Sequence, residues 1–210
     1  MRMILLGAPG SGKGTQAEIL SQRFSIPIIS TGNILKEAVA AGTELGVAAA
    51  GYIDQGQLVP DELIIGVLKK RIEQEDCADG FILDGVPRTR AQAEALNQMG
   101  VAIDRVISIH VTDDAIIERI TGRRSCPGCG ASYHIEYRVP IKPGVCDNCG
   151  TELVTRSDDT EEMIRTRLQV YHESTEQLKE YYSQTGILYT VQGEREISDT
   201  TRNLFRVLEL

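Results

Sequence analysis

A glycine-rich segment near the start of the sequence has the residue types of a phosphate-binding loop. It reads GAPGSGKGT from Gly7 to Thr15, follows the apolar run MRMILL and precedes a helical pattern. In such an arrangement, backbone N–H groups and the positive end of the helix surround a phosphate, and Lys13 reaches toward the outer phosphates. Because Gly14 stands directly after the lysine and the hydroxyl of Thr15 comes one place late, we expect magnesium to be held differently from the usual pattern of such loops.

Four of the five cysteines form a second pattern, with the spacing C-x2-C-x16-C-x2-C and a glycine after each pair. They are Cys126, Cys129, Cys146 and Cys149. Four thiolates complete the tetrahedral coordination of one ion, so the spacing predicts a structural metal, zinc first and iron second. Two disulfides, free thiols without a metal, or His134 in place of one thiolate are the alternatives. Cys77 stands apart from this group, and we interpret it as a small filler residue.

Arginine recurs in motifs that lie far apart in the sequence. Arg119 and Arg123 precede the first cysteine pair, and Arg88 follows a predicted strand. A guanidinium group binds phosphate oxygens with two parallel hydrogen bonds. No histidine or activated serine forms a comparable group and no general base is evident, which favours phosphoryl transfer, a reaction catalysed by position and charge. The expected catalytic residues are Lys13, Arg88, Arg123, Arg156 and Arg167.

The net charge limits the possible partners. The 210 residues include 22 basic and 30 acidic side chains, a formal charge of −8, which disfavours a surface that follows a nucleic-acid backbone. A zinc-ribbon module that binds nucleic acid or protein, with the P-loop as a nucleotide-dependent switch, is the alternative from another functional class. The N-terminal apolar run is too brief for a signal peptide and no stretch approaches membrane-spanning length, so we expect a cytoplasmic protein without a membrane partner.

Strand-like and helix-like segments alternate along the chain, which is typical of an α/β fold with a parallel sheet covered by helices. The apolar runs predict strands at 1–6, 81–85 and 105–111, and the helical periodicities predict helices over 13–24, 60–76 and 159–184. The segment 122–157 interrupts this alternation. It is rich in Cys, Gly and Pro, and its metal pattern indicates a small unit that folds around the ion.

Six ordered motifs resemble the adenylate kinase family, in its long-lid, metal-binding bacterial form. They are GAPGSGKGT at 7–15, STGNILK at 30–36, GQLVPDE at 56–62, ILDGVPRTRAQAEAL at 82–96, GRR at 122–124, and TRSDD at 155–159 followed by RTRL at 165–168. The resemblance implies reversible phosphoryl transfer from MgATP to AMP, giving two ADP and maintaining adenine nucleotide balance. It also implies Mg²⁺ with ATP, a structural Zn²⁺ or Fe ion, a monomer, and no nucleic-acid partner.

The same resemblance implies an α/β fold with a P-loop core, in which helices flank a five-stranded parallel sheet. An AMP-binding flap and a small metal-binding lid would be inserted in this core. The expected boundaries are 1–29 with 60–121 and 160–210 for the core, 30–59 for the flap and 122–159 for the lid.

The resemblance assigns binding roles to individual residues. The expected ATP-binding residues are Gly10, Ser11, Gly12, Lys13, Gly14, Thr15, Arg119, Arg123, Ser132, Tyr133 and Arg195. The expected AMP-binding residues are Thr31, Lys36, Gln57, Leu58, Val59, Gly85, Val86, Pro87, Arg88, Gln92, Arg156 and Arg167. Gln92 would read the adenine edge through its amide donor and acceptor. Asp84 would face the waters of the metal ion, or else cap a strand end.

Two further aspartates and one tyrosine have alternative interpretations. Asp158 and Asp159 either orient the arginines of the lid or cap the long helix that follows them. Tyr133 either stacks near the base of ATP or packs inside the lid.

Three departures from the family pattern concern the acceptor nucleotide. Lys36 stands where the family usually has arginine, and a lysine offers a point charge instead of a bidentate fork. Asn33 replaces the commoner aspartate, and Val86 replaces the usual phenylalanine. UMP or CMP as acceptor is therefore the alternative within the enzyme class, although relatives that prefer those nucleotides generally have a short lid.

Overall fold

The computed structural model describes residues 1–209 and has a five-stranded parallel sheet at its centre, in the order β2-β3-β1-β4-β7. The strands are β1 Arg2–Leu6, β2 Ile28–Ser30, β3 Phe81–Asp84, β4 Arg105–His110 and β7 Leu188–Gln192. In the central strand β1, Met3 and Leu5 enter one apolar cluster, whereas Ile4 and Leu6 enter another. Burial of both faces explains why this strand is apolar from Met3 to Leu6.

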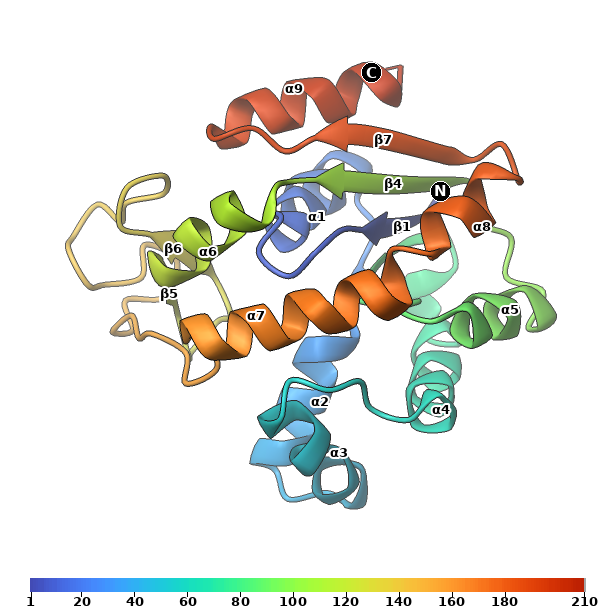
Figure 1. Ribbon diagram of the computed structural model, residues 1–210, viewed down its shortest axis with the longest axis horizontal. Helices are drawn as coiled ribbons and strands as arrows, with labels where there is room; N and C mark the ends of the chain where they lie inside the picture. Colours follow the sequence, from blue (N-terminus) through green and yellow to red (C-terminus); the bar gives the residue numbers. More distant parts are fainter. Residues whose placement is uncertain (210) are drawn as a thin grey trace.

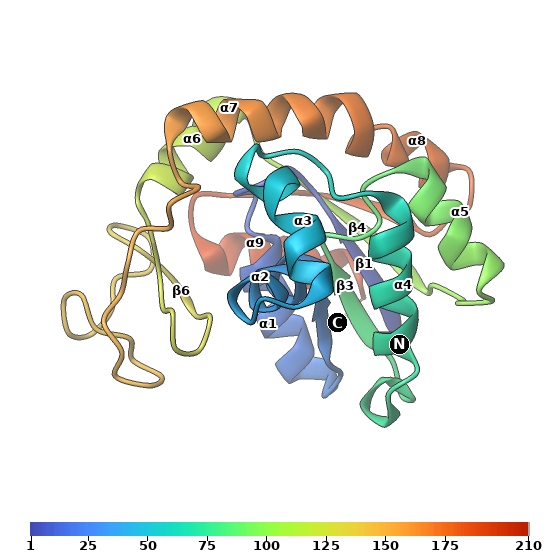
Figure 2. The same ribbon diagram turned by 90° about the horizontal axis from the view of Figure 1, so that it is seen from below.

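Helices cover both faces of the sheet (Figure 1, Figure 2). The cluster around Met3 and Leu5 includes side chains from α1 Lys13–Phe24, α6 Asp113–Thr121, α7 Glu161–Val170 and α9 Ile197–Val207. The cluster around Ile4 and Leu6 includes side chains from α2 Thr31–Ala40, α3 Glu44–Asp54, α4 Asp61–Ile72, α5 Arg90–Gln98 and α8 Leu178–Ser183. The predicted α/β fold, with a five-stranded parallel sheet flanked by helices, is confirmed.

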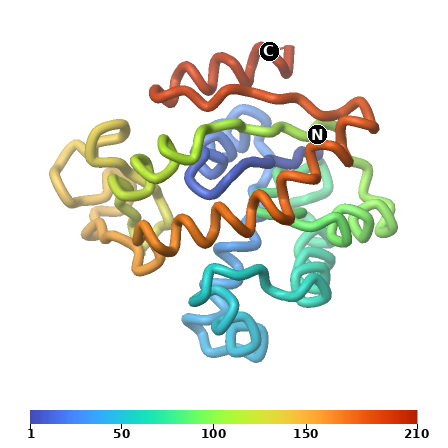
Figure 3. Tube along the Cα trace, in the orientation of Figure 1, coloured from blue at the N-terminus to red at the C-terminus, as the bar shows by residue number. Residues whose placement is uncertain are grey.

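Two segments extend away from this core (Figure 1). The first contains α2 and α3, which pack against each other. The second leaves the core after α6 and returns at α7, as the chain trace shows (Figure 3). It contains the antiparallel pair β5 Arg123–Ser125 and β6 Ser132–His134. Its apolar cluster is small and includes two of its cysteines.

The predicted strands at 1–6, 81–85 and 105–111 are confirmed by β1, β3 and β4, and the helix over 13–24 is confirmed by α1. The predicted helix over 60–76 extends too far. α4 ends at Ile72, and a short 3-10 turn, Glu75–Cys77, follows it. Cys77 is buried there in the apolar cluster, as expected for a filler residue. Within residues 1–209, every helix is too short or too polar to cross a membrane.

The predicted helix over 159–184 is confirmed as a helical stretch, but it is interrupted. α7 ends at Val170, a π-helical segment spans Tyr171–Thr175, and α8 begins at Leu178. The N–H of Glu176 donates to the carbonyl of Tyr171 at 2.9 Å, which is the wider hydrogen-bond spacing of a π turn. The segment places the hydroxyl of Thr175 2.9 Å from the backbone oxygen of Arg88. The interruption of the helix therefore coincides with a hydrogen bond between Thr175 and the loop after β3.

Packing between α2 and α3 predicts opposite effects for two glycines of α3. A Cβ atom on Gly46 would overlap the carbonyl group of Ala38, whereas a Cβ on Gly51 would meet no heavy atom within 4 Å. We expect Gly46→Ala to lower the free energy of unfolding by about 1–3 kcal/mol, because the two helices must separate. Gly51→Ala is the matched control and should raise it by up to about 1 kcal/mol. Denaturant unfolding of both variants measures this, and equal effects would contradict the packing argument.

Candidate active site

The glycine-rich loop joins the end of β1 to the start of α1 and has the backbone shape of a phosphate-binding loop. Gly10 and Gly12 have φ angles of 82° and 96°, a region that glycine adopts readily and other residues do not. Gly12 is also the N-cap of α1, and no side chain caps this end of the helix. The first N–H groups of α1 are therefore available to an anion.

Lys13 lies across the loop that precedes it. Its Nζ atom donates to the carbonyl oxygens of Gly7 and Ala8 at 2.7 and 2.8 Å. Desolvation in the cleft lowers the pKa of Lys13 to about 8, and the nearby carboxylate of Asp84 only partly offsets this. A Cβ on Gly14 would lie 3.8 Å from Asp84 Oδ2, so this carboxylate borders the loop.

A cavity of about 390 Å³ extends from the P-loop to the segment after α6. Every residue expected to bind ATP lines it: Gly10, Ser11, Gly12, Lys13, Gly14, Thr15, Arg119, Arg123, Ser132, Tyr133 and Arg195. Arg119 also donates to the carbonyl oxygens of Gly193 and Glu194, at 3.2 and 2.6 Å. The structure thus brings the P-loop and the basic residues of the lid segment to one cavity.

A second cavity of about 90 Å³ lies beside α2 and the loop after β3. Nine residues expected to bind AMP line it: Thr31, Lys36, Gln57, Leu58, Val59, Gly85, Arg88, Gln92 and Arg167. Pro87 and Arg156 line the larger cavity instead, and Val86 is buried in the core and lines neither. Lys36, Arg88 and Arg167 line both cavities and therefore lie where the two meet.

Asp159 orients an arginine and does not cap the helix after it. Its buried carboxylate accepts two hydrogen bonds from Arg123, one from Nε at 2.9 Å and one from Nη2. The N-cap of α7 is Thr160, whose hydroxyl accepts from the N–H of Met163 at 3.3 Å. Two parallel charge-assisted hydrogen bonds hold the plane of the Arg123 guanidinium.

Asp158 joins basic groups from separate parts of the chain. Its Oδ2 atom accepts from Lys36 Nζ at 3.2 Å and from Arg167 Nη1 at 3.1 Å. Desolvation lowers the pKa of Lys36 and of Arg167, and Asp158 opposes both shifts. Arg156 Nε donates to the hydroxyl of Ser125 at 2.8 Å. The two aspartates and Ser125 therefore position the basic residues around the junction of the cavities.

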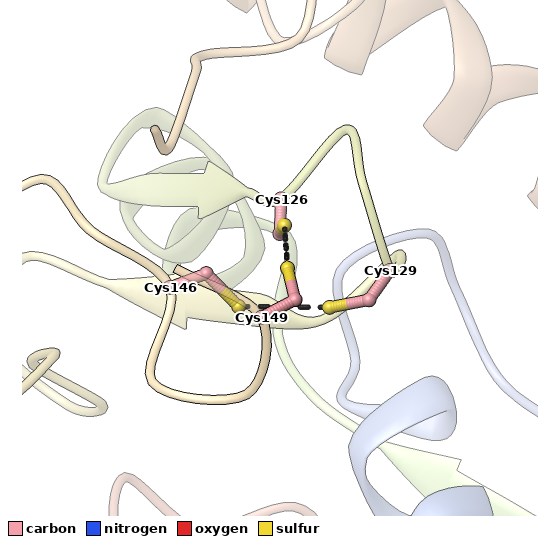
Figure 4. A group of neighbouring side chains, drawn as sticks. All are labelled: Cys126, Cys129, Cys146 and Cys149. Atoms are coloured by element: carbon pink, nitrogen blue, oxygen red, sulfur yellow. Dashed lines mark hydrogen bonds between the residues drawn. The ribbon is translucent and has the colours of Figure 1, made fainter. Parts of the chain in front are cut away.

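The four clustered cysteines have the arrangement of a metal centre (Figure 4). Their Sγ atoms all lie within 4.8 Å of one another. The Cys126–Cys149 and Cys129–Cys146 sulfur separations are 3.3 and 3.5 Å, far longer than a disulfide bond of about 2.05 Å. Four thiolates at about 2.3 Å from one zinc ion would lie about 3.8 Å apart, so the donor set fits a closed structural site. Disulfides are excluded here, since all four cysteines are free.

Within residues 1–209, the clustered ligand atoms come from the four cysteines and do not include His134. Its Nδ1 atom accepts from the N–H groups of Glu136 and Tyr137 at 3.0 and 3.2 Å. Tyr133 packs inside the lid segment, where its hydroxyl accepts from Asp147 N at 2.8 Å. Its O–H therefore faces Cys146 Sγ, 3.5 Å away, and together with the backbone N–H groups of Asn148 and Cys149 it lowers the pKa of that thiol to about 6. A thiolate is the form that binds metal.

Sequence reasoning missed Tyr137, which lines the larger cavity. Its ring stacks on His134 with centroids 4.1 Å apart, and the guanidinium of Arg195 lies 5.2 Å from the ring centroid. The Tyr137 hydroxyl donates to Glu118. The spacing of three residues between His134 and Tyr137 is a local signal for the stack, whereas the bond to Glu118 depends on how the chain after β6 meets α6.

A comparison with known families identifies this combination of loop, basic residues and cysteine cluster. A family model described as adenylate kinase matches residues 5–187. The chain belongs to the adenylate kinase family. Curated proteins named adenylate kinase from Caldicellulosiruptor bescii, Archaeoglobus fulgidus and Clostridium beijerinckii are 56%, 51% and 48% identical to it. The alignments cover 99–100% of this chain and 98–99% of the relatives. The predicted family and its enzymatic class, a nucleotide phosphotransferase, are confirmed.

Titration of Lys13 predicts a pH dependence of this adenylate kinase family enzyme. Lys13 of the ligand-free enzyme loses its charge as the pH rises through about 8, so kcat/KM for ATP should fall above that pH. In kcat the same decline should lie at higher pH, because bound phosphates favour the protonated amine. Initial rates from pH 6.5 to 10 measure both. Coincident declines in kcat and kcat/KM would contradict the assignment to Lys13.

The same pKa shift acts on folding. Below about pH 8 both the folded and the unfolded chain hold the proton on Lys13, and its desolvation cost is fully present. Between about pH 8 and 10.5 only the unfolded chain holds it, so this group makes the free energy of unfolding rise with pH in that window.

Metal removal should separate stability from catalysis. The cysteine cluster lies in a segment with a small apolar cluster and contributes no open coordination position, so we expect a metal-free protein to unfold at a lower temperature. At low temperature its kcat should change little. Cys149→Ser should reproduce the loss of stability, and the exposed Ser183→Ala is the control that keeps the metal. Immediate loss of all activity in folded, metal-free protein would contradict a structural role.

Proposed function

We propose that the chain transfers the terminal phosphoryl group of MgATP reversibly to AMP, giving two ADP. One observation carries this proposal: the P-loop cavity and the smaller cavity meet at Lys36, Arg88 and Arg167. A triphosphate on the P-loop and a monophosphate in the smaller cavity would bring their reacting phosphates to this junction. The reaction would balance the three adenine nucleotides.

Electrostatic stabilisation is the main task of the residues at the junction. Charge on the oxygens of the transferring group would be stabilised by Lys13 and by arginine forks, with no covalent intermediate. Arg119 and Arg123 would hold ATP phosphates, Arg88 would hold the AMP phosphate, and Arg156 and Arg167 would bridge them. Mg²⁺ bound to ATP would neutralise phosphate charge, and the carboxylate of Asp84 beside the P-loop would hold its waters.

Three functional units follow from this assignment. The core, at 1–29, 60–121 and 160–210, would carry the P-loop; the segment 30–59 would bind AMP; and 122–159 would cover ATP. A metal ion, zinc before iron, would stiffen the cover so that it delivers Arg123 and Arg156 together and excludes water. We expect a monomer in the cytoplasm that binds ATP, ADP and AMP, without a nucleic-acid or membrane partner.

Where the acceptor site departs from the family pattern, we expect a change in the affinity for AMP and not a change in the reaction. Lys36 is held by Asp158 and offers a single ammonium group, so AMP should bind more weakly than with arginine there. Gln92 lines the smaller cavity and favours a purine with a donor and an acceptor on its edge. UMP and CMP lack a ring that would fill the same place.

Disproportionation of ADP tests the proposed reaction directly. The purified protein would receive ADP and Mg²⁺ as its only substrates, and ATP and AMP would be measured by chromatography. We expect equal amounts of the two products. Arg88→Lys, which keeps the charge and loses the fork, should raise KM for AMP about tenfold and leave KM for ATP almost unchanged. Absence of turnover in folded protein that binds ATP would overturn the proposal and favour another acceptor.

A further inference from the structure

The amide of Gln92 is held on two sides by protein groups. Its Nε2 atom donates to Asp61 Oδ1 at 2.7 Å, and its Oε1 atom accepts from the backbone N–H of Arg88 at 2.7 Å. The other oxygen of Asp61 accepts from the Thr89 hydroxyl at 2.9 Å. Thr89 also caps α5 by accepting from the N–H of Gln92 at 3.2 Å. Both oxygens of Asp61 are therefore fixed.

These two partners allow only one orientation of the amide. A carboxylate only accepts hydrogen bonds and a backbone N–H only donates them. If the amide of Gln92 were inverted, its oxygen would face the Asp61 carboxylate and its NH2 group would face the N–H of Arg88. Gln92 is only 2% exposed, so water cannot restore the lost hydrogen bonds. After the inversion, two acceptors would face each other at Asp61 and two donors would face each other at Arg88, and both pairs would be buried.

The fixed orientation decides what the amide offers to a ligand. Gln92 lines the smaller cavity, whereas Asp61 lies behind it and does not line it. With one hydrogen and one lone pair already used, the amide keeps one N–H donor and one oxygen lone pair. A 6-aminopurine has an acceptor at N1 and a donor at the 6-amino group. A 6-oxopurine has the reverse, a donor at N1 and an acceptor at O6, and would require the inverted amide.

We propose that Asp61 is a positioning residue that sets the acceptor specificity: it locks the Gln92 amide so that the smaller cavity accepts a 6-aminopurine monophosphate and rejects a 6-oxopurine monophosphate. The inference rests on the proposed function and deepens it. A site whose buried donor and acceptor are fixed discriminates strongly, because the wrong ligand leaves both unpaired.

The substitution Asp61→Asn tests whether Asp61 fixes the orientation of the Gln92 amide, because asparagine has the same size and shape as aspartate. An asparagine amide can accept from Gln92 or donate to it, so it removes the barrier to inversion on this side. IMP is the matched probe, since it differs from AMP only at position 6 and in the proton on N1. With MgATP as donor, chromatography of ADP and IDP gives kcat/KM for each acceptor. We expect the AMP-to-IMP ratio of kcat/KM to fall about tenfold in the variant.

Glu62→Gln is the matched control. Glu62 is exposed and shares the first turn of α4 with Asp61, so its loss removes the same charge from the same helix end. The AMP-to-IMP ratio should stay at the value of the unsubstituted protein. Both acceptors are compared in one preparation, so the ratio does not depend on the fraction of folded protein.

Two outcomes would overturn the inference. An unchanged ratio in Asp61→Asn would show that Asp61 does not set the orientation of the amide. An equal fall of kcat/KM for both acceptors would show a merely structural role. Failure of the proposed function is distinguishable from both, because the unsubstituted protein would then leave AMP unphosphorylated.

Discussion

Repulsion among clustered cations is the constraint on which the site depends. Desolvation lowers the pKa of Lys13, Lys36, Arg88, Arg156 and Arg167, and the charge of at least one nearby arginine adds to the effect for each of them. Three carboxylates, Asp84, Asp158 and Asp159, offset part of this charge by direct pairing or proximity. The remaining positive potential is local, since the whole chain has a net charge of −8. The phosphates of a bound nucleotide would supply the missing negative charge. The cleft is therefore electrostatically balanced only when a nucleotide is bound.

The basic residues come from both the core and the lid segment, and each group is rigid for a different reason. In the core, Lys13 and Arg88 follow strands that are buried on both faces. The lid segment buries only four residues in its apolar cluster, with Leu153 packed against them, and two of the four are cysteines. So small a cluster cannot fix the direction of an arginine by packing alone. The Asp159–Arg123 pair does this where the segment joins α7, and a metal ion held by the cysteine cluster would do it within the segment.

Features with local sequence signals could be predicted, and features that depend on tertiary contacts could not. The P-loop, the cysteine spacing and three buried strands each have a pattern within a few residues. β2 has only three residues, and only one of the five residues of β7 is buried, so neither has a clear hydrophobic pattern. The π-helical break lies in a stretch whose apolar periodicity continues across it. The bond between Asp61 and Gln92 joins residues 31 positions apart, whose proximity only the fold creates.

The π-helical segment accommodates one extra residue in the chain. Its wider turn at Tyr171–Thr175 precedes Leu178 and Tyr182, which are buried in the core. A π turn closes one rotation with about one residue more than an α turn, so removing one residue would restore a regular α-helix and leave α8 facing the core. The extra residue therefore leaves the register of α8 unchanged, and it brings the hydroxyl of Thr175 to the carbonyl of Arg88.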